Sequence, residues 1–296
     1  MVYYLKTITK YSKLTKLGMG NLKGETEEFW IENPPLILIN NLYDIECEGD
    51  WKGTPKIKTI KAHEVEDEQA IILKKCHGPK KVPTLREIAT LASEYVSSTP
   101  DQTNKYQPRI LTVEQVIEAL KFYLSDDYEG EHRAAKFVKC PASLKYHDSQ
   151  DGGLLRHVVK MLEMCSKIIV EGKFYEYEIH PLRLVTGIIF HDMGKVDQYV
   201  QNDEGFWEQS PDASYLGNHI GLGIIRWSQK GKEVCRILGD ETMFVDVMHM
   251  IMSHHGPVSN GFGSLVDPFG HDAWTLYSLD MMDSRQEETY KPIVEE

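Results

Sequence analysis

Long apolar runs, paired cysteines and a secretion signal are all missing from this 296-residue chain. Its longest apolar runs, at residues 36–39 and 185–190, are far shorter than the ~20 residues that span a bilayer. Residues 1–13 lack the apolar core and cleavage site of a signal peptide. The five cysteines are odd in number and show no C-x-x-C spacing, which is typical of reduced structural thiols. These absences predict a mature, cytoplasmic protein without a membrane partner.

Basic side chains are also scarce, because 33 lysines and arginines face 45 acidic residues, for a formal net charge of −12. Residues 1–100 hold 14 basic and 14 acidic side chains, whereas residues 101–296 hold 19 and 31. An acidic surface does not attract polyanions through its long-range field. If the substrate is a nucleic acid, metal ions must therefore supply much of the attraction.

The composition is that of a folded protein long enough for two domains, and the hydrophobic pattern changes along it. Residues 1–82 are rich in β-branched residues and turn formers, with strands expected at 36–42, 56–60 and 69–73. This pattern predicts a small barrel or sandwich. Four aromatic residues there could stack on nucleobases, although packing in the core is the alternative for each; they are Phe29, Trp30, Tyr43 and Trp51.

From residue 85 onward the apolar period becomes helical. Residues 83–130 are expected to form a helical connector, with one helix at 113–124, and residues 131–296 an all-helical domain. The predicted fold is therefore α+β, with a β domain followed by a helical bundle.

Histidines and aspartates recur on the apolar faces of these helices. The dipeptide His-Asp occurs three times, at residues 147, 191 and 271, and so is not decisive by itself. The recurrence is more informative: polar side chains interrupt apolar helical positions at His157, His191-Asp192, His219, His254 or His255, and Asp280. A shared cation that offsets their desolvation explains five such conflicts better than five separate hydrogen-bonded histidines. Nitrogen and carboxylate ligands without thiolates suit Mn, Fe, Co, Ni or Zn, with Mg also compatible.

The order His157, His191-Asp192, Asp280 resembles the HD superfamily of metal-dependent phosphohydrolases. The phrases around these residues are similar to the YhaM-type 3′-to-5′ exoribonucleases; they are residues 146–157, 190–195, 216–220, 252–256 and 279–283. The motifs cover about residues 135–285, and the family places an OB-fold before its HD domain. The resemblance thus implies an OB-like domain at 1–82 and an HD domain at 131–296. It departs from the family phrases at Asp148, at Asn218 and in the loop 201–213.

The resemblance also implies roles for single residues. His157, His191, Asp192 and Asp280 would hold one divalent ion, and Asp192 would bridge to a second ion held by His219 and His254. Two ions ~3.5–4 Å apart can hold a hydroxide that attacks phosphorus, with manganese the first expectation.

Residues beside these ligands have open roles. Lys195 would bind a phosphate oxygen or complete a helix end. His255 is a reserve ligand or supports one. His147 would face substrate or cap a helix, and Asp283 would support the site or form a salt bridge with Arg285 or Arg156.

The sequence leaves three functions open. The first is a metal-dependent exonuclease that releases nucleotides from the 3′ end of single-stranded RNA or DNA, guided by the OB-like domain. The second has the same site but hydrolyses a small nucleotide or a cyclic or oligonucleotide signal, which the acidic charge favours. The third is an inactive nucleic-acid or nucleotide binding protein. A homo-oligomer is compatible with each.

Overall fold

The computed structural model describes residues 1–10, 14–34, 42–63, 67, 69, 82–99, 110–125, 133–144, 148, 151–171, 178–201 and 207–285. The chain divides near residue 81 into two compact units, which are treated separately below. This boundary agrees with the change of hydrophobic period in the sequence.

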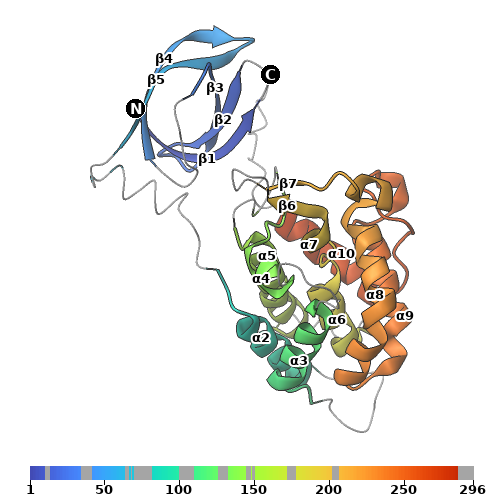
Figure 1. The fold of residues 1–296 in the computed structure, drawn as a ribbon. Coiled ribbons are helices and arrows are strands. Elements are labelled where there is room, and N and C mark those ends of the chain that lie inside the picture. The colour runs from blue at the N-terminus through green and yellow to red at the C-terminus, as the bar shows by residue number, and fades with distance from the viewer. Residues whose placement is uncertain are drawn as a thin grey trace, which may run out of the picture. The chain divides into compact units, whose positions relative to one another are not determined.

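The first unit is a closed five-stranded barrel, drawn in blue in Figure 1. Its strands are β1 (Val2–Lys10), β2 (Thr15–Gly20), β3 (Thr26–Ile31), β4 (Leu42–Trp51) and β5 (Thr54–Ala62). They pair in the order β1-β2-β3-β5-β4, and β4 returns to β1. Only β3 and β5 pair in parallel among these five strands. This is the OB-like barrel that the sequence predicts.

The backbone conformation of two residues explains the tight hairpin between β4 and β5. Lys52 and Gly53, between β4 and β5, both have positive φ angles, of 53° and 80°. Two-residue hairpin loops of type I′ need this backbone, and glycine adopts it without strain. The strand predicted at 56–60 lies within β5. The strands predicted at 36–42 and 69–73 fall almost wholly outside the described residues.

The barrel core contains two of the four aromatic residues that were candidates for stacking on nucleobases, Phe29 and Tyr43. Phe29 is 2% exposed and packs edge-on against Tyr3, at a ring distance of 5.1 Å. Tyr43 is buried in the same cluster. Successive residues of a strand point to opposite faces, so Phe29 turns inward and its neighbour Trp30 turns outward. Phe29 therefore stabilises the barrel and is not available to stack on a base.

The second unit is a bundle of helices with one short hairpin. The helices are α2 (Leu85–Ser98), α3 (Val113–Leu124), α4 (Arg133–Lys139), α5 (Gly153–Cys165), α6 (Pro181–Phe190), α7 (Lys195–Gln198), α8 (Asn218–Ile237), α9 (Phe244–Ser253) and α10 (His271–Arg285). A π-helical segment, Ser166–Glu171, continues α5. Short 3₁₀ turns occur at Ala213–Leu216, Glu241–Met243 and Val258–Asn260. None of the described helices is long and apolar enough to cross a membrane.

Two expectations for this unit were wrong in detail. Helices α2 and α3 are not a separate connector, because their buried faces belong to the same hydrophobic cluster as α5 to α10. Amphipathic helices must bury their apolar stripe, and the nearest large core here is that of the bundle. The unit is also not wholly helical, since β6 (Tyr199–Gln201) and β7 (Trp207–Gln209) form an antiparallel hairpin. This hairpin lies within the loop 201–213 and the residues just before it.

Candidate metal centre

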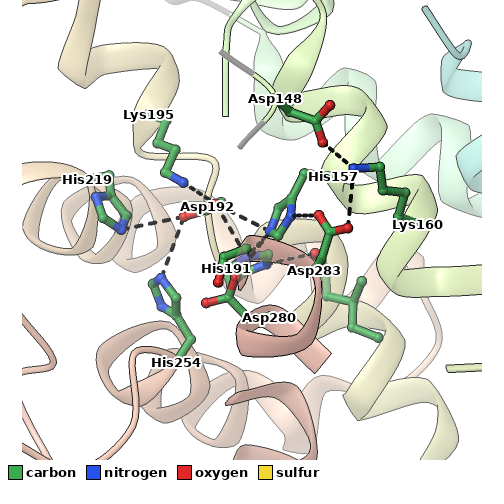
Figure 2. A network of polar contacts seen from close by, with 12 residues as sticks. Asp148, His157, Lys160, His191, Asp192, Lys195, His219, His254, Asp280 and Asp283 are labelled. Atoms are coloured by element: carbon green, nitrogen blue, oxygen red, sulfur yellow. Dashed lines mark hydrogen bonds and ion pairs between the residues drawn. The ribbon is translucent and has the colours of Figure 1, made fainter. Parts of the chain in front are cut away.

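Five segments of the helical unit bring histidines and aspartates together at one place (Figure 2). His157 comes from α5 and Asp280 from α10, while His219 lies in the first turn of α8. His191 and Asp192 directly follow α6, and His254 and His255 directly follow α9. All of these side chains are buried except His255, which is half-buried. The sequence-predicted ligands therefore converge.

Asp192 lies between two groups of imidazoles. Its Oδ2 is 3.4 Å from Nε2 of His191 and 3.7 Å from Nε2 of His157. Its Oδ1 is 3.4 Å from Nε2 of His219 and 3.5 Å from Nε2 of His254. Each carboxylate oxygen of Asp192 therefore faces a different pair of imidazoles.

Two sets of three ligand atoms flank this carboxylate. His157, His191 and Asp280 form one set, with Nε2 of His157 3.3 Å from Nε2 of His191 and 3.4 Å from Oδ1 of Asp280. His219, His254 and His255 form the other. Within each set the ligand atoms lie within 4.8 Å of one another, so each could hold a metal ion. His255, expected only as a reserve, completes the second set.

One imidazole of each set, His191 or His254, donates from Nδ1 to a backbone carbonyl oxygen, which fixes the orientation of the ring. Nδ1 of His191 is 2.9 Å from the carbonyl oxygen of Ile188, and Nδ1 of His254 is 2.8 Å from that of Ile251. Each carbonyl belongs to the residue three positions earlier, at the end of a helix where carbonyls lack helical partners. A carbonyl oxygen can only accept, so Nδ1 donates and the lone pair of the neutral ring is on Nε2.

Side chains and a loop carbonyl orient the other three rings. Nδ1 of His219 is 3.1 Å from Oε1 of Gln198. Nδ1 of His157 is 2.7 Å from Oδ2 of Asp283. Nδ1 of His255 is 2.7 Å from the carbonyl oxygen of Phe262. All five histidines thus present Nε2 to the centre, which is the arrangement that metal-ligating histidines adopt.

Several inward-pointing atoms have no hydrogen-bond partner among the described residues. They are Oδ1 of Asp192, Nε2 of His219 and Nε2 of His254, all buried. A buried polar atom left without a partner costs about 1–3 kcal/mol. Because these three atoms face one another, one cation would satisfy all of them. The donor set, buried and free of thiolates, therefore fits a divalent metal.

The pKa values of the ionisable groups in this cluster are shifted in different directions. Burial raises the pKa of Asp192, but Lys195 and His191 outweigh it and hold that pKa well below its usual value. Burial lowers the pKa of His157, yet hydrogen bonds to Asp280 and Asp283 overcome this and raise it to about 9. Burial lowers the pKa of His219 well below its usual value. The carboxylates are therefore ionised and ready to bind a cation.

Lys195 is buried beside this cluster, with Nζ 2.5 Å from Oδ2 of Asp192. It begins helix α7 and does not complete the end of α6, so helix capping does not explain its place. Burial lowers its pKa, but Asp192 outweighs this and raises it, so the ammonium is charged. Lys195 therefore supplies a positive charge next to the bridging carboxylate.

The other residues that the sequence analysis named beside the ligands are Asp283, Arg156 and His147. Asp283 binds His157 and Lys160, and not Arg156 or Arg285 as the alternative supposed. Arg156 reaches Asp148 and the carbonyl oxygen of Asp151. His147 lies outside the described residues. Sequence reasoning missed the supporting roles of Gln198 and Lys160, although Lys160 follows His157 by three residues and so shares its helix face.

In the barrel, the two remaining aromatic candidates form a pair. The rings of Trp30 and Trp51 meet edge-on at 4.9 Å, and Nζ of Lys52 lies 4.7 Å from the centre of the Trp51 ring. Trp51 is 41% exposed. A solvent-accessible indole can stack on a nucleobase, and an ammonium beside it can attract the phosphate of the same nucleotide.

The geometry defines a buried histidine–aspartate centre able to hold divalent cations, and this chain is similar to curated proteins whose names describe nucleases. The 3′-5′ exoribonuclease YhaM of Geobacillus sp. (strain WCH70) is 29% identical over 202 residues, which cover 67% of this chain and 57% of that protein. YhaM of Shouchella clausii (strain KSM-K16) is 31% identical over 159 residues, covering 52% and 44%. YhaM of Bacillus subtilis (strain 168) is 28% identical over 151 residues, covering 51% and 44%.

The chain spans about half the length of the curated relatives that it matches. No family model and no solved structure matches the chain.

Proposed function

We propose that this protein is a metal-dependent phosphohydrolase of the HD type that releases nucleotides from the 3′ end of single-stranded RNA or DNA. The observation that carries the proposal is the convergence of imidazole Nε2 atoms on both oxygens of Asp192. The Nδ1 atom of each of these rings is hydrogen-bonded to another protein group. Such pre-orientation is expected of metal ligands, whose Nδ1 donates to a protein acceptor while Nε2 faces the ion. The names of the similar proteins support the exonuclease assignment.

His157, His191 and Asp280 would hold one divalent cation, and His219, His254 and His255 a second. Asp192 would contact both through its two oxygens. Manganese is the first expectation, with iron, cobalt, nickel, zinc or magnesium compatible with the same ligands. Bound there, divalent cations polarise a phosphoryl oxygen and activate water at neutral pH.

Lys195 acts beside the bridging carboxylate. Its charged ammonium holds Asp192 in place through a 2.5 Å contact and can bind a non-bridging phosphate oxygen of the substrate. Arg156 does not reach this centre, since its guanidinium is engaged with Asp148. We therefore assign the phosphate contact to Lys195 and a supporting role to Arg156.

The barrel would bind the single strand away from its 3′ end. Trp51 and Trp30 supply aromatic surface, and Lys52 supplies positive charge beside it. Base stacking of this kind is tolerant of sequence, which suits an exonuclease that must process any strand.

One observation favours a second function, which is hydrolysis of a small nucleotide or a cyclic or oligonucleotide signal. The net charge of −12 opposes the approach of a long polyanion, whereas a small ligand carries fewer phosphates to repel. The metal centre would be the same, and only the substrate would differ.

One experiment separates these functions. Purified protein with manganese is incubated with end-labelled RNA, the matching DNA, cyclic dinucleotides and a set of nucleotides. We expect shortening of RNA from its 3′ end, and its loss in Asp192→Ala because both sets of ligands lose their shared carboxylate. Glu163→Ala, an exposed change on α5, is the matched control and should remain active.

Hydrolysis that survives Asp192→Ala would overturn the proposed centre. Turnover of cyclic dinucleotides or nucleotides with RNA and DNA left intact would overturn the exonuclease assignment and establish the second function. Manganese binding without turnover of any substrate would identify a binding protein.

A further inference from the structure

A line of alternating charges extends from His157 away from the metal centre (Figure 2). Oδ2 of Asp283 is 2.7 Å from Nδ1 of His157, and Oδ1 of the same carboxylate is 3.3 Å from Nζ of Lys160. Lys160 in turn lies 2.6 Å from Oδ2 of Asp148. The line therefore runs from a proposed metal ligand through a carboxylate and an ammonium to a second carboxylate.

The far end of this line is strongly buried. The side chain of Asp148 is 0% exposed, and Nε of Arg156 lies 3.2 Å from its Oδ1. Asp148 thus pairs with both Arg156 and Lys160, and Lys160 is shared with the buried carboxylate of Asp283. Burying an ion in this way is costly and gives no stability over an apolar replacement unless its geometry is good. A role beyond simple stability is therefore worth testing.

The arrangement restrains one side chain in particular. Oδ2 of the Asp283 carboxylate is held by the imidazole of His157, and Oδ1, which makes no hydrogen bond among the described residues, forms an ion pair with Lys160. With only one oxygen held, the carboxylate could turn about its last torsion and release Nδ1. The ion pair with Lys160 opposes this rotation, and the 2.6 Å contact with Asp148 keeps Lys160, whose side chain is 28% exposed, from turning toward solvent.

We infer that Lys160 and Asp148 are positioning residues for His157, which keep Nε2 of this imidazole directed at a divalent cation through the carboxylate of Asp283. The inference rests on the proposed function, because it takes His157 to be a metal ligand. It concerns one set of ligands only. His191 and His254 are oriented by backbone carbonyls and do not depend on this line.

The test measures manganese affinity by calorimetry in folded, metal-depleted protein, alongside kcat and KM. Lys160→Met should weaken manganese binding by about 10–100-fold, the usual cost of losing support behind a metal ligand. Asp148→Asn should weaken it less, because Lys160 remains. Lys160→Arg, which keeps a cation in reach of Asp283, should restore most of the affinity.

Lys160→Met leaves Asp148 with less compensating charge and could unfold the protein, so the double variant is also required. Asp148→Asn with Lys160→Met removes one charge of each sign. If the two residues act in series, the double variant should bind manganese no more weakly than Lys160→Met alone, whereas independent effects would multiply. Lys167→Met and Glu163→Gln are the matched controls, since both side chains are exposed on the same helical stretch.

Manganese affinity within about twofold of the unchanged protein in folded Lys160→Met and in the double variant would overturn the inference. So would effects of the two single variants that multiply in the double variant. A purely structural role would lower the unfolding temperature but leave manganese affinity and KM unchanged, and would also overturn it. The affinity and RNA hydrolysis of the unchanged protein test the proposed function separately, because the inference depends on the ratio between variant and unchanged protein.

Discussion

The two units of this protein bury different kinds of side chain. Among the described residues of the barrel, the buried polar side chains are Thr15 and Asn21, and neither is charged. The helical unit buries histidines, aspartates, lysines and an arginine near its centre. Packing of apolar side chains explains the barrel core, whereas the buried ionisable groups of the bundle require a further cause.

Even within the bundle, buried charged groups differ in whether all their atoms have hydrogen-bond partners. Asp272, which belongs to neither set of ligand atoms, accepts from the backbone N–H of His180 at 2.9 Å and pairs with Arg183. Asp192 has an oxygen without a hydrogen-bond partner among the described residues, facing two imidazoles in the same condition. The contrast teaches that burial alone does not mark a site. A site is marked by several buried polar groups that point at one another and lack hydrogen-bond partners.

The first prediction has the largest expected effect and tests whether the barrel core and the bundle core are independent. Phe29→Ala should destabilise the barrel by about 3–5 kcal/mol, because it removes a large buried ring and leaves a cavity. Hydrogen exchange of the barrel amides measures this loss. Manganese affinity should not change, since no ligand comes from the barrel. Leu22→Ala, at an exposed barrel position, is the control. A fall in manganese affinity in Phe29→Ala would show that the two cores are coupled.

The second prediction concerns the ionisable core of the bundle. In cation-free protein the pKa of His157 is raised to about 9, so below that pH a metal must displace a proton from the imidazole. The affinity for manganese should therefore fall about tenfold for each pH unit between about pH 8 and pH 7. Calorimetric titration at the two pH values measures the change. An affinity that stays constant across this interval would mean that His157 is already neutral there.

The third and smallest effect is expected at the surface of the barrel. Trp51→Ala should raise KM for single-stranded RNA about fivefold, equivalent to ~1 kcal/mol, because one base loses its stacking partner. The kcat should be preserved, since Trp51 contributes nothing to the ligand sets. Leu22→Ala again serves as the matched change. An unaltered KM would remove the barrel surface from the proposed RNA path and sharpen the division between the units.

Sequence patterns picked out side chains that the fold brings together, because each of them conflicts with its surroundings. His157, Asp280 and His219 interrupt apolar helix faces, and that conflict is visible without a structure. The three His-Asp dipeptides are not equivalent: the second lies in the histidine–aspartate centre, Asp272 of the third pairs with Arg183, and Asp148 of the first joins the line behind His157. Only long-range contacts distinguish them.

The features that escaped prediction depend on such contacts. Phe29 and Trp30 are adjacent aromatics, and the strand period places them on opposite faces without saying which face is inside. The β6–β7 hairpin has strands too short for a recognisable alternation. Gln198 and Lys160 are ordinary polar residues in the sequence, and they gain their roles from His219 and Asp283 across the fold.

The backbone support of His191 and His254 has a consequence for how this centre can change over many generations. A carbonyl oxygen is present whatever residue occupies position 188 or 251, so no single substitution there deletes the acceptor. The supports of His157 and His219 are side chains, and one nucleotide change can remove either. The rings supported by backbone carbonyls are therefore shielded from drift, while the two supported by side chains are open to adjustment of metal preference and strength.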